Sequence, residues 1–316
     1  MNRRRLLGST GALGSMLLGG APQHPSHGGN MTVGHVDHAR NGFDPHGILR
    51  DFDGGAVSTD QQGRRVREYE LVVFAKDIEV APGVVFPAWT YNGRVPGPTI
   101  RATQGDRLRV RLLNASEHPH TIHFHGFHSA AMDGVPGAGE VRPGEEFVYD
   151  FVAGPFGTHL YHCHSLPLRA HIHRGLYGAF IVDPPGGRPE ANEMVMVLNG
   201  FDTNFDEENE VYAVNTVAFA YADPPIRIAA GQLQRAHVIN ITEFDLLNSI
   251  HLHANFFHLF RGGTSLAPHE FVDTVSMGQA ERHMIEFTYP EPGRFMFHAH
   301  QTEFAELGWM SFFEVT

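Results

Sequence analysis

Three segments of the chain, residues 69–74, 107–112 and 146–151, alternate apolar and polar positions with a period of two. Successive side chains of a strand point to opposite faces, so this alternation predicts strands with one buried face. Turn-forming sequences such as Asn92-Gly93 and Pro143-Gly144 lie between them. No long stretch shows the 3.6-residue period of an amphipathic helix. The pattern therefore predicts an all-β chain of the sandwich type.

The order of these features occurs twice along the chain. Residues 105–110, which precede the first histidine cluster, are echoed by residues 231–238, which precede a second one. Two prolines and two glycines at 184–187 separate the copies. We predict one sandwich domain that has been duplicated, with the first copy over 66–183, a linker over 184–193 and the second copy over 194–316.

The first 65 residues differ from the rest. Three arginines at 3–5 precede a short apolar run, which predicts a signal peptide over 1–21 of the twin-arginine type and export to the periplasm or the exterior. Residues 22–65 are rich in Gly, His, Asp and Ser, which predicts a flexible arm. The sequence leaves open whether the histidines of this arm bind copper; they are His24, His27, His35, His38 and His46. No second apolar segment is long enough to span a membrane.

Composition narrows the function. The formal net charge is −12, which gives no reason to expect nucleic acid as a partner. The chain has 23 histidines and 1 cysteine, so it has no internal disulfide framework. A lone cysteine among many histidines suggests a metal ligand, because thiolate and imidazole together suit copper and zinc.

Four His-x-His pairs carry the strongest chemical signal. Residues i and i+2 of a strand share a face, so each pair presents two imidazoles side by side, and each copy of the domain holds two pairs. The pairs are His123/His125, His162/His164, His251/His253 and His298/His300. Cys163 points away from its two neighbours and can serve a separate metal site that is joined to theirs by a few covalent bonds. The alternative is an inert buried thiol.

Spacing suggests partners for Cys163. A blue-copper site uses two imidazoles, a thiolate and a weak axial group. We assign the imidazoles to His120 and His171, with His173 as the alternative to His171. Leu176 then takes the axial place, where it cannot bind copper, and the missing axial ligand should raise the reduction potential.

The runs HTIHFHG, YHCHSLPLRAHIHRGLYG, IHLHANFF and FHAHQTEFAELGWM resemble the four copper-binding segments of multicopper oxidases. The resemblance covers nearly all of 66–316. It implies two cupredoxin-like Greek-key β-sandwich domains and about four coppers per chain, namely one type 1 ion and a trinuclear cluster. Matched motif by motif, His123 and His251 would hold the type 2 copper. The type 3 pair would be held by His125, His162, His164, His253, His298 and His300.

The second copy lacks the type 1 ligands. Asn248 stands at the place of His120 and Ala299 at the place of Cys163, while Phe304 and Trp309 stand near the second imidazole and at the axial place. This resembles two-domain multicopper oxidases with a type 1 copper in the first domain only. That resemblance implies a homotrimer with each cluster between two chains, which fits half a site on each domain.

The expected function is that of a laccase-like enzyme. One-electron oxidation of a small donor, such as a phenol or an aromatic amine, would begin near an exposed His171 and would be coupled to the reduction of dioxygen to water. Asp133, Glu303 and Glu306 are the candidate proton relays. Trp89 and Trp309 are interpreted as packing residues. The alternatives are a copper nitrite reductase and a non-catalytic copper-binding or electron-transfer protein.

Overall fold

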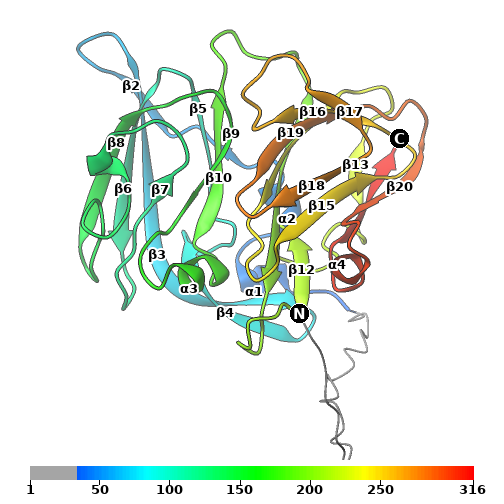
Figure 1. Ribbon diagram of the computed structural model, residues 1–316, viewed down its shortest axis with the longest axis horizontal. Helices are drawn as coiled ribbons and strands as arrows, with labels where there is room; N and C mark the ends of the chain where they lie inside the picture. The colour runs from blue at the N-terminus through cyan, green and yellow to red at the C-terminus, as the bar shows by residue number, and fades with distance from the viewer. Residues whose placement is uncertain (1–33) are drawn as a thin grey trace, which may run out of the picture. The chain divides into compact units, whose positions relative to one another are not determined.

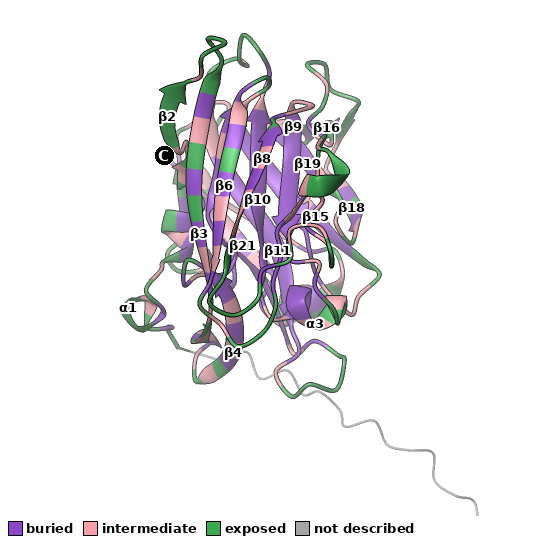
Figure 2. Cartoon of the chain, turned by 90° about the vertical axis from the view of Figure 1, so that its left-hand side faces the viewer, coloured by how far each residue is buried: buried purple, intermediate pink, exposed green. Residues whose placement is uncertain are grey.

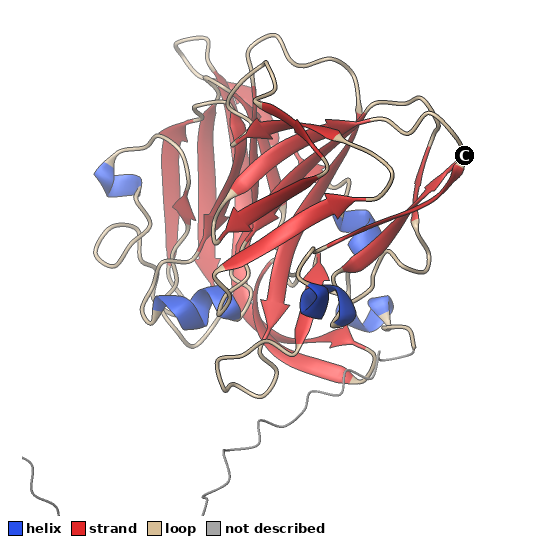
Figure 3. Ribbon diagram, turned by 45° about the vertical axis from the view of Figure 1, so that its right-hand side comes forward, coloured by secondary structure: helices blue, strands red, loops and turns tan. Residues whose placement is uncertain are grey.

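The computed structural model describes residues 34–316, which form strands joined by loops and a few short helices (Figure 3). The expected signal peptide over 1–21 lies outside the described residues. No helix of residues 34–316 is long and apolar enough to cross a bilayer.

The first sandwich has two sheets, with strand orders β1-β5-β10-β9-β7 and β2-β3-β6-β8, and β4 pairs with β3 (Figure 1). The strands predicted at 69–74, 107–112 and 146–151 are confirmed as parts of β3, β6 and β8. The strands are β1 (Phe52–Asp53), β2 (Ala56–Thr59), β3 (Arg65–Ala81), β4 (Val84–Tyr91), β5 (Thr99–Thr103), β6 (Arg107–Asn114), β7 (His123–Phe124), β8 (Glu146–Val152), β9 (Gly157–His162) and β10 (Tyr177–Asp183), and the loops hold the 3-10 helix η1 (Ala130–Met132) and the helix α3 (Leu168–His173).

The second sandwich also has two sheets, with strand orders β12-β11-β14-β19-β16-β17 and β13-β21-β20-β15-β18. Its elements are β11 (Asn192–Phe201), β12 (Val211–Val214), β13 (Ile226–Ile228), β14 (Gln234–Asn240), β15 (Leu247–Leu252), β16 (Phe257–Arg261), β17 (Glu270–Val272), β18 (Thr274–Gly278), β19 (Arg282–Phe287), β20 (Gly293–His298), α4 (Thr302–Glu306) and β21 (Met310–Val315).

Strand pairing in the two sandwiches follows one plan. Strand β3 runs parallel to β6, and β6 runs antiparallel to β8. In the second sandwich β11 runs parallel to β14, and β14 runs antiparallel to β19. The registers of the histidine strands also agree, because His123 faces His162 and His251 faces His298. This repetition confirms the predicted pair of β-sandwiches.

Strands at the junction of the two sandwiches are buried on both faces (Figure 2). Alternate residues of β11 show why: Met194 and Met196 enter the core of the second sandwich, whereas Val195 and Val197 enter a core shared with the first. Leu160 of β9 lies in the same shared core. A strand buried on both faces reads as a continuous apolar run, so its sequence carries no alternation.

The flexible arm predicted over 22–65 is wrong from residue 34 onward, and residues 22–33 lie outside the described residues. Helices α1 (His38–Asn41) and α2 (Pro45–Ile48) are followed by β1 and β2, which pair with β5 and β3. The amide of Asn41 donates to the backbone of Glu79 and accepts from it, at 2.9 and 2.8 Å. Ile48 and Leu49 are buried. A few apolar and capping side chains thus fix a segment whose composition is otherwise polar.

Candidate metal centres

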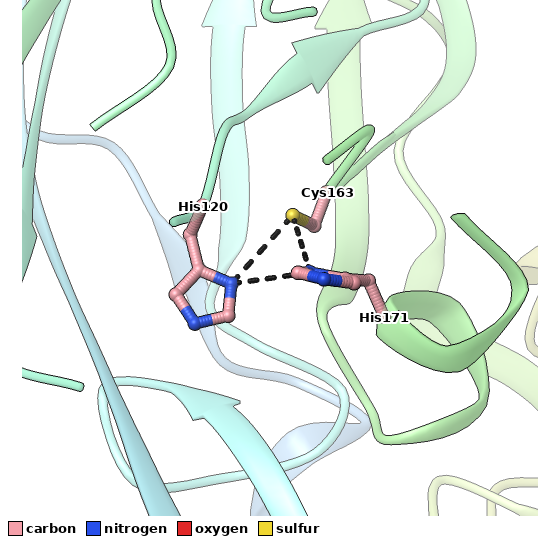
Figure 4. Close-up of side chains that lie close together, drawn as sticks. All are labelled: His120, Cys163 and His171. Atoms are coloured by element: carbon pink, nitrogen blue, oxygen red, sulfur yellow. Dashed lines mark hydrogen bonds between the residues drawn. The ribbon is translucent and has the colours of Figure 1, made fainter. Parts of the chain in front are cut away.

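Cys163 and two imidazoles meet at one point of the first sandwich (Figure 4). Cys163 follows β9, His120 precedes β7, and His171 lies on α3. The sulfur lies 3.2 Å from Nδ1 of His171 and 3.8 Å from Nδ1 of His120, and the two nitrogens are 3.2 Å apart. Three soft and borderline donors therefore surround one small volume.

The chemistry of this donor set fits a copper ion of the blue type. Burial lowers the pKa of His120 to about 3 and that of His171 to about 4, so both imidazoles are neutral at physiological pH, as a metal ligand must be. Burial also raises the pKa of the Cys163 thiol, so the thiolate needs a cation beside it. The backbone N–H of Thr121 points at this sulfur, with the two atoms 3.4 Å apart.

The structure separates the two candidates for the second imidazole. Nε2 of His173 accepts from the backbone N–H of Asp202, at 3.1 Å, and its ring lies among Phe86, Phe205 and Phe244. It is His171, therefore, that lies beside the sulfur. Leu176 is fully buried, and its carbonyl accepts from the N–H of Cys163.

The expectation of an exposed His171 is wrong. Its exposed fraction is 2%, and those of His120 and Cys163 are 0%. The ring of Trp89 lies against it, with the ring centroids 4.8 Å apart. Burial of a histidine by a residue 82 positions earlier in the chain depends on tertiary structure and leaves no local signal in the sequence.

Four imidazoles gather at the edge strand β7 and the end of β9. Nε2 of His125 and Nε2 of His162 are 3.2 Å apart, and the rings of His123 and His164 lie within ring-contact distance, their centroids 5.5 Å apart. We call His123, His125, His162 and His164 the first histidine set. His162 ends β9 and Cys163 follows it in the chain, so this set and the thiolate site meet at the end of one strand.

The second sandwich repeats the arrangement. Nε2 of His253 and Nε2 of His298 are 2.9 Å apart, and the ring of His251 lies 5.5 Å from that of His300. We call His251, His253, His298 and His300 the second histidine set. His253 and His300 are exposed.

Backbone carbonyls hold four of these rings in one orientation. Nδ1 of His123 donates to the carbonyl of Asp133 at 2.7 Å, and Nδ1 of His251 donates to that of Asp273 at 3.0 Å. In the same way, His162 donates to its neighbour Cys163, and His298 to Ala299. A ring that donates through Nδ1 presents the lone pair of Nε2 to a metal. Two rings of each set are therefore oriented so that Nε2 could bind a metal.

Within one chain the two sets stay apart. Among residues 34–316, the groups of metal-ligating atoms that lie within 4.8 Å of one another include three histidines of the first set and three of the second, but no group mixes the sets. Each sandwich thus carries half of the predicted eight-histidine site.

The second sandwich repeats the backbone hydrogen bonds that surround the thiolate site, and we call these bonds the frame of the site. In the second sandwich this frame holds the indole of Trp309. The N–H of Ala299 donates to the carbonyl of Trp309, as the N–H of Cys163 does to that of Leu176. Trp309 N–H in turn donates to the carbonyl of Phe304, as Leu176 N–H does to that of His171. The buried indole of Trp309 donates to the side-chain oxygen of Asn248. The proposed correspondence of these positions is therefore seen in the backbone hydrogen bonds.

The carboxylates divide into two groups. Oδ1 of Asp133 lies 3.3 Å from Nδ1 of His123, so this aspartate is part of the first set's surroundings. Glu303 and Glu306 are exposed on α4, and neither belongs to a metal-ligating group of residues 34–316. Sequence reasoning missed Asp273, whose carboxylate lies 3.9 Å from Nδ1 of His251. Spacing gave no such signal, since Asp133 follows His123 by 10 positions whereas Asp273 follows His251 by 22.

Comparison with known proteins agrees with this geometry. Residues 73–187 and residues 189–316 each match a family described as multicopper oxidase. A solved structure described as a multicopper oxidase is 55% identical, with a TM-score of 0.88, over 89% of this chain and 100% of its own. Its likeness confirms the cupredoxin-like fold.

More distant relatives differ in activity. The copper-containing nitrite reductase of Neisseria meningitidis is 27% identical over 70% of this chain and 61% of its own length. Laccase-7 of Arabidopsis thaliana is 37% identical over 42% of this chain and 24% of its own length. The chain thus spans less than two thirds of the length of either relative.

Proposed function

The chain belongs to the multicopper oxidase family, and on that premise we propose that it is a laccase-like oxidase. It would take single electrons from a small reducing substrate, such as a phenol or an aromatic amine, and deliver them to dioxygen, which is reduced to water. Export by a twin-arginine-type signal to the periplasm or the exterior is part of this proposal.

One observation carries the proposal: two equivalent sets of four histidines, one of which lies beside the thiolate site at the end of β9. In the assignment suggested by the sequence, about four coppers would bind per chain. His120, Cys163 and His171 would hold the type 1 ion, and the two sets would hold the type 2 ion and the type 3 pair. When bound, copper supplies the one-electron chemistry and the site at which dioxygen is reduced.

The chain links the thiolate site to the first set in two ways. Cys163 is bonded covalently to His162 and His164 on either side. In addition, Nδ1 of His162 donates to the carbonyl of Cys163 at 2.9 Å. Electrons would leave the sulfur by these routes, and the route through His162 is buried.

Protons must also reach dioxygen. Asp133 is half-exposed and contacts His123, so it can take protons from solvent and hold them beside the first set. Asp273 is similarly placed beside His251. The exposed Glu303 and Glu306 remain candidates only for relays farther from the histidines.

We further propose a homotrimer in which each cluster combines the first set of one chain with the second set of the next. The separation of the two sets within a chain supports this, because a head-to-tail contact joins unlike surfaces and closes into a ring. Exposed aromatic side chains beside each set also support it: Phe127 follows His125 and is 72% exposed, and Phe256 follows His253 and is 50% exposed.

Nitrite reduction is the second candidate, since copper-containing nitrite reductases are among the relatives. A single catalytic copper would need only about three imidazoles and would leave the other histidines without a use. The oxidase function uses all eight histidines of the two sets.

The copper content and the electron acceptor distinguish the oxidase from the nitrite reductase. Copper-loaded protein should contain about four coppers per chain, show a strong blue absorption band from the thiolate, and consume dioxygen when a phenol is added. About two coppers per chain, with nitrite consumed in place of dioxygen, would establish the reductase.

Complementation tests the shared cluster. One chain would carry His125→Ala and the other His253→Ala, each inactive alone. If clusters form between chains, co-expression restores about a quarter of the wild-type oxygen consumption, because in random trimers that fraction of contacts joins two intact sets. Clusters formed within a chain would give no recovery.

A further inference from the structure

The thiolate site has no ligand edge open to a donor. His120, Cys163 and His171 are at most 2% exposed. An electron from a donor at the surface has to cross the side chains that cover these ligands.

Trp89 lies over both imidazoles. Its ring centroid is 4.8 Å from that of His171 and 5.4 Å from that of His120, both edge to face. The residue is half-buried, and its backbone N–H donates to the carbonyl of Arg174, at 2.8 Å. This bond ties the end of β4 to the segment that follows α3, which fixes the indole against the helix that bears His171.

The outer side of the indole is occupied by polar groups at the surface. The exposed ring of His118 lies 4.9 Å from it, and the guanidinium of Arg174 lies 5.6 Å from its centroid. Arg174 also lies 4.5 Å from the ring of Phe205, which is 47% exposed. Aromatic and cationic groups thus surround the outer side of Trp89.

We propose that Trp89 is the port through which electrons reach the thiolate site, and that the donor docks over it beside His118 and Arg174. This rests on the proposed function. The donor would lose one electron, which would cross the π system of the indole to the imidazoles and be accepted by the copper(II) ion that His120, Cys163 and His171 would hold. The indole itself is neither oxidised nor reduced overall. A phenolic donor releases its proton to solvent. The guanidinium favours electron-rich aromatic donors that carry acidic groups.

The test is the rate at which donors bleach the blue band without oxygen, followed by stopped flow. The probes are 2,6-dimethoxyphenol and a disulfonated aromatic azine. Trp89→Leu, which removes the π system, should slow both by at least about tenfold, whereas Trp89→Phe should stay within about threefold. Phe312→Leu is the matched control, because an arginine, Arg294, also lies over its ring, at 4.3 Å, but in the second sandwich, and it should leave the rate unchanged. Copper content and the position of the blue band show for each variant that the site is intact.

A Trp89→Leu protein with an intact blue band and an equal or faster rate overturns the proposal, because the indole would then only cover the site. Should Trp89→Leu fail to load copper, Arg174→Gln decides. It should lower the rate with the sulfonated donor relative to the phenol by about threefold or more, and an unchanged ratio overturns the docking site. A wild-type protein without a blue band would refute the proposed function itself.

Discussion

Thr121 joins the thiolate site to the first histidine set, and its hydroxyl offers a sharp test of that connection. Thr121 is fully buried, and its Oγ1 accepts from the backbone N–H of His164 at 2.7 Å. The same hydroxyl lies 3.8 Å from the sulfur of Cys163. Thr121→Val keeps the shape of the side chain and replaces the hydroxyl with a methyl group.

The contacts of Thr121 determine how large the effects of Thr121→Val should be. The variant leaves the N–H of His164 without an acceptor, which should lower the free energy of unfolding of the metal-free protein by about 1–3 kcal/mol. It also removes a donor near the sulfur, so the copper-loaded protein should show a shifted blue band and a lower reduction potential. Urea denaturation, absorption spectra and a redox titration measure the three quantities.

The second sandwich supplies the control. Ser249 accepts from the N–H of His300 at 2.7 Å, in the place that Thr121 has in the first sandwich, and the residue in the place of Cys163 is Ala299. Ser249→Ala should therefore lower stability by a similar amount and leave the blue band unchanged. The reasoning fails if Thr121→Val unfolds at the wild-type urea concentration, or if both variants shift the band equally.

Three further outcomes follow from the structure. Cys163→Ser should abolish the blue band and donor oxidation, while circular dichroism should show that the variant still folds. Full donor oxidation by this variant would show that the proposed electron path is wrong. Burial lowers the pKa of His237 to about 3, and its Nδ1 lies 2.7 Å from the hydroxyl of Thr158. The unfolded chain binds this proton below about pH 6.5 and the folded chain does not. As the pH falls from about 6.5 to about 4, the free energy of unfolding of the metal-free wild-type protein should therefore drop by about 1.4 kcal/mol per pH unit more than that of His237→Asn. Parallel curves of stability against pH for the two proteins would contradict this. Ile48→Ala should cost about 2–5 kcal/mol in urea denaturation, because the side chain is 1% exposed, whereas a truly flexible arm would show no change.

Local geometry explains how much of the site the sequence could predict. Residues i and i+2 of a strand share a face whatever surrounds them, so the pairing of His123 with His125 and the opposite direction of Cys163 follow from the chain alone. The spacing of His120 and His171 around Cys163 likewise placed three donors that the structure brings together. Their role as copper ligands stays a prediction.

Long-range contacts explain what the sequence could not predict. The side chain of Asn41 is fixed by the backbone of Glu79, and the ring of Trp89 covers His171. Neither partner is near in sequence, and neither residue type favours such a contact. Polar composition therefore suggested a mobile arm, and the imidazole of His171 was expected to be exposed.

A duplicated fold raises the question of where metal goes when an apoprotein is loaded. Two similar backbone frames would compete for the same ion if both were open, and an ion in the second frame would have no thiolate beside it. The indole of Trp309, tied to Asn248, occupies the second frame with a side chain that offers no lone pair. The frame without the sulfur is thereby closed to metal before any copper arrives. Fidelity of metallation is thus built into the folded chain and does not depend on the order in which ions bind.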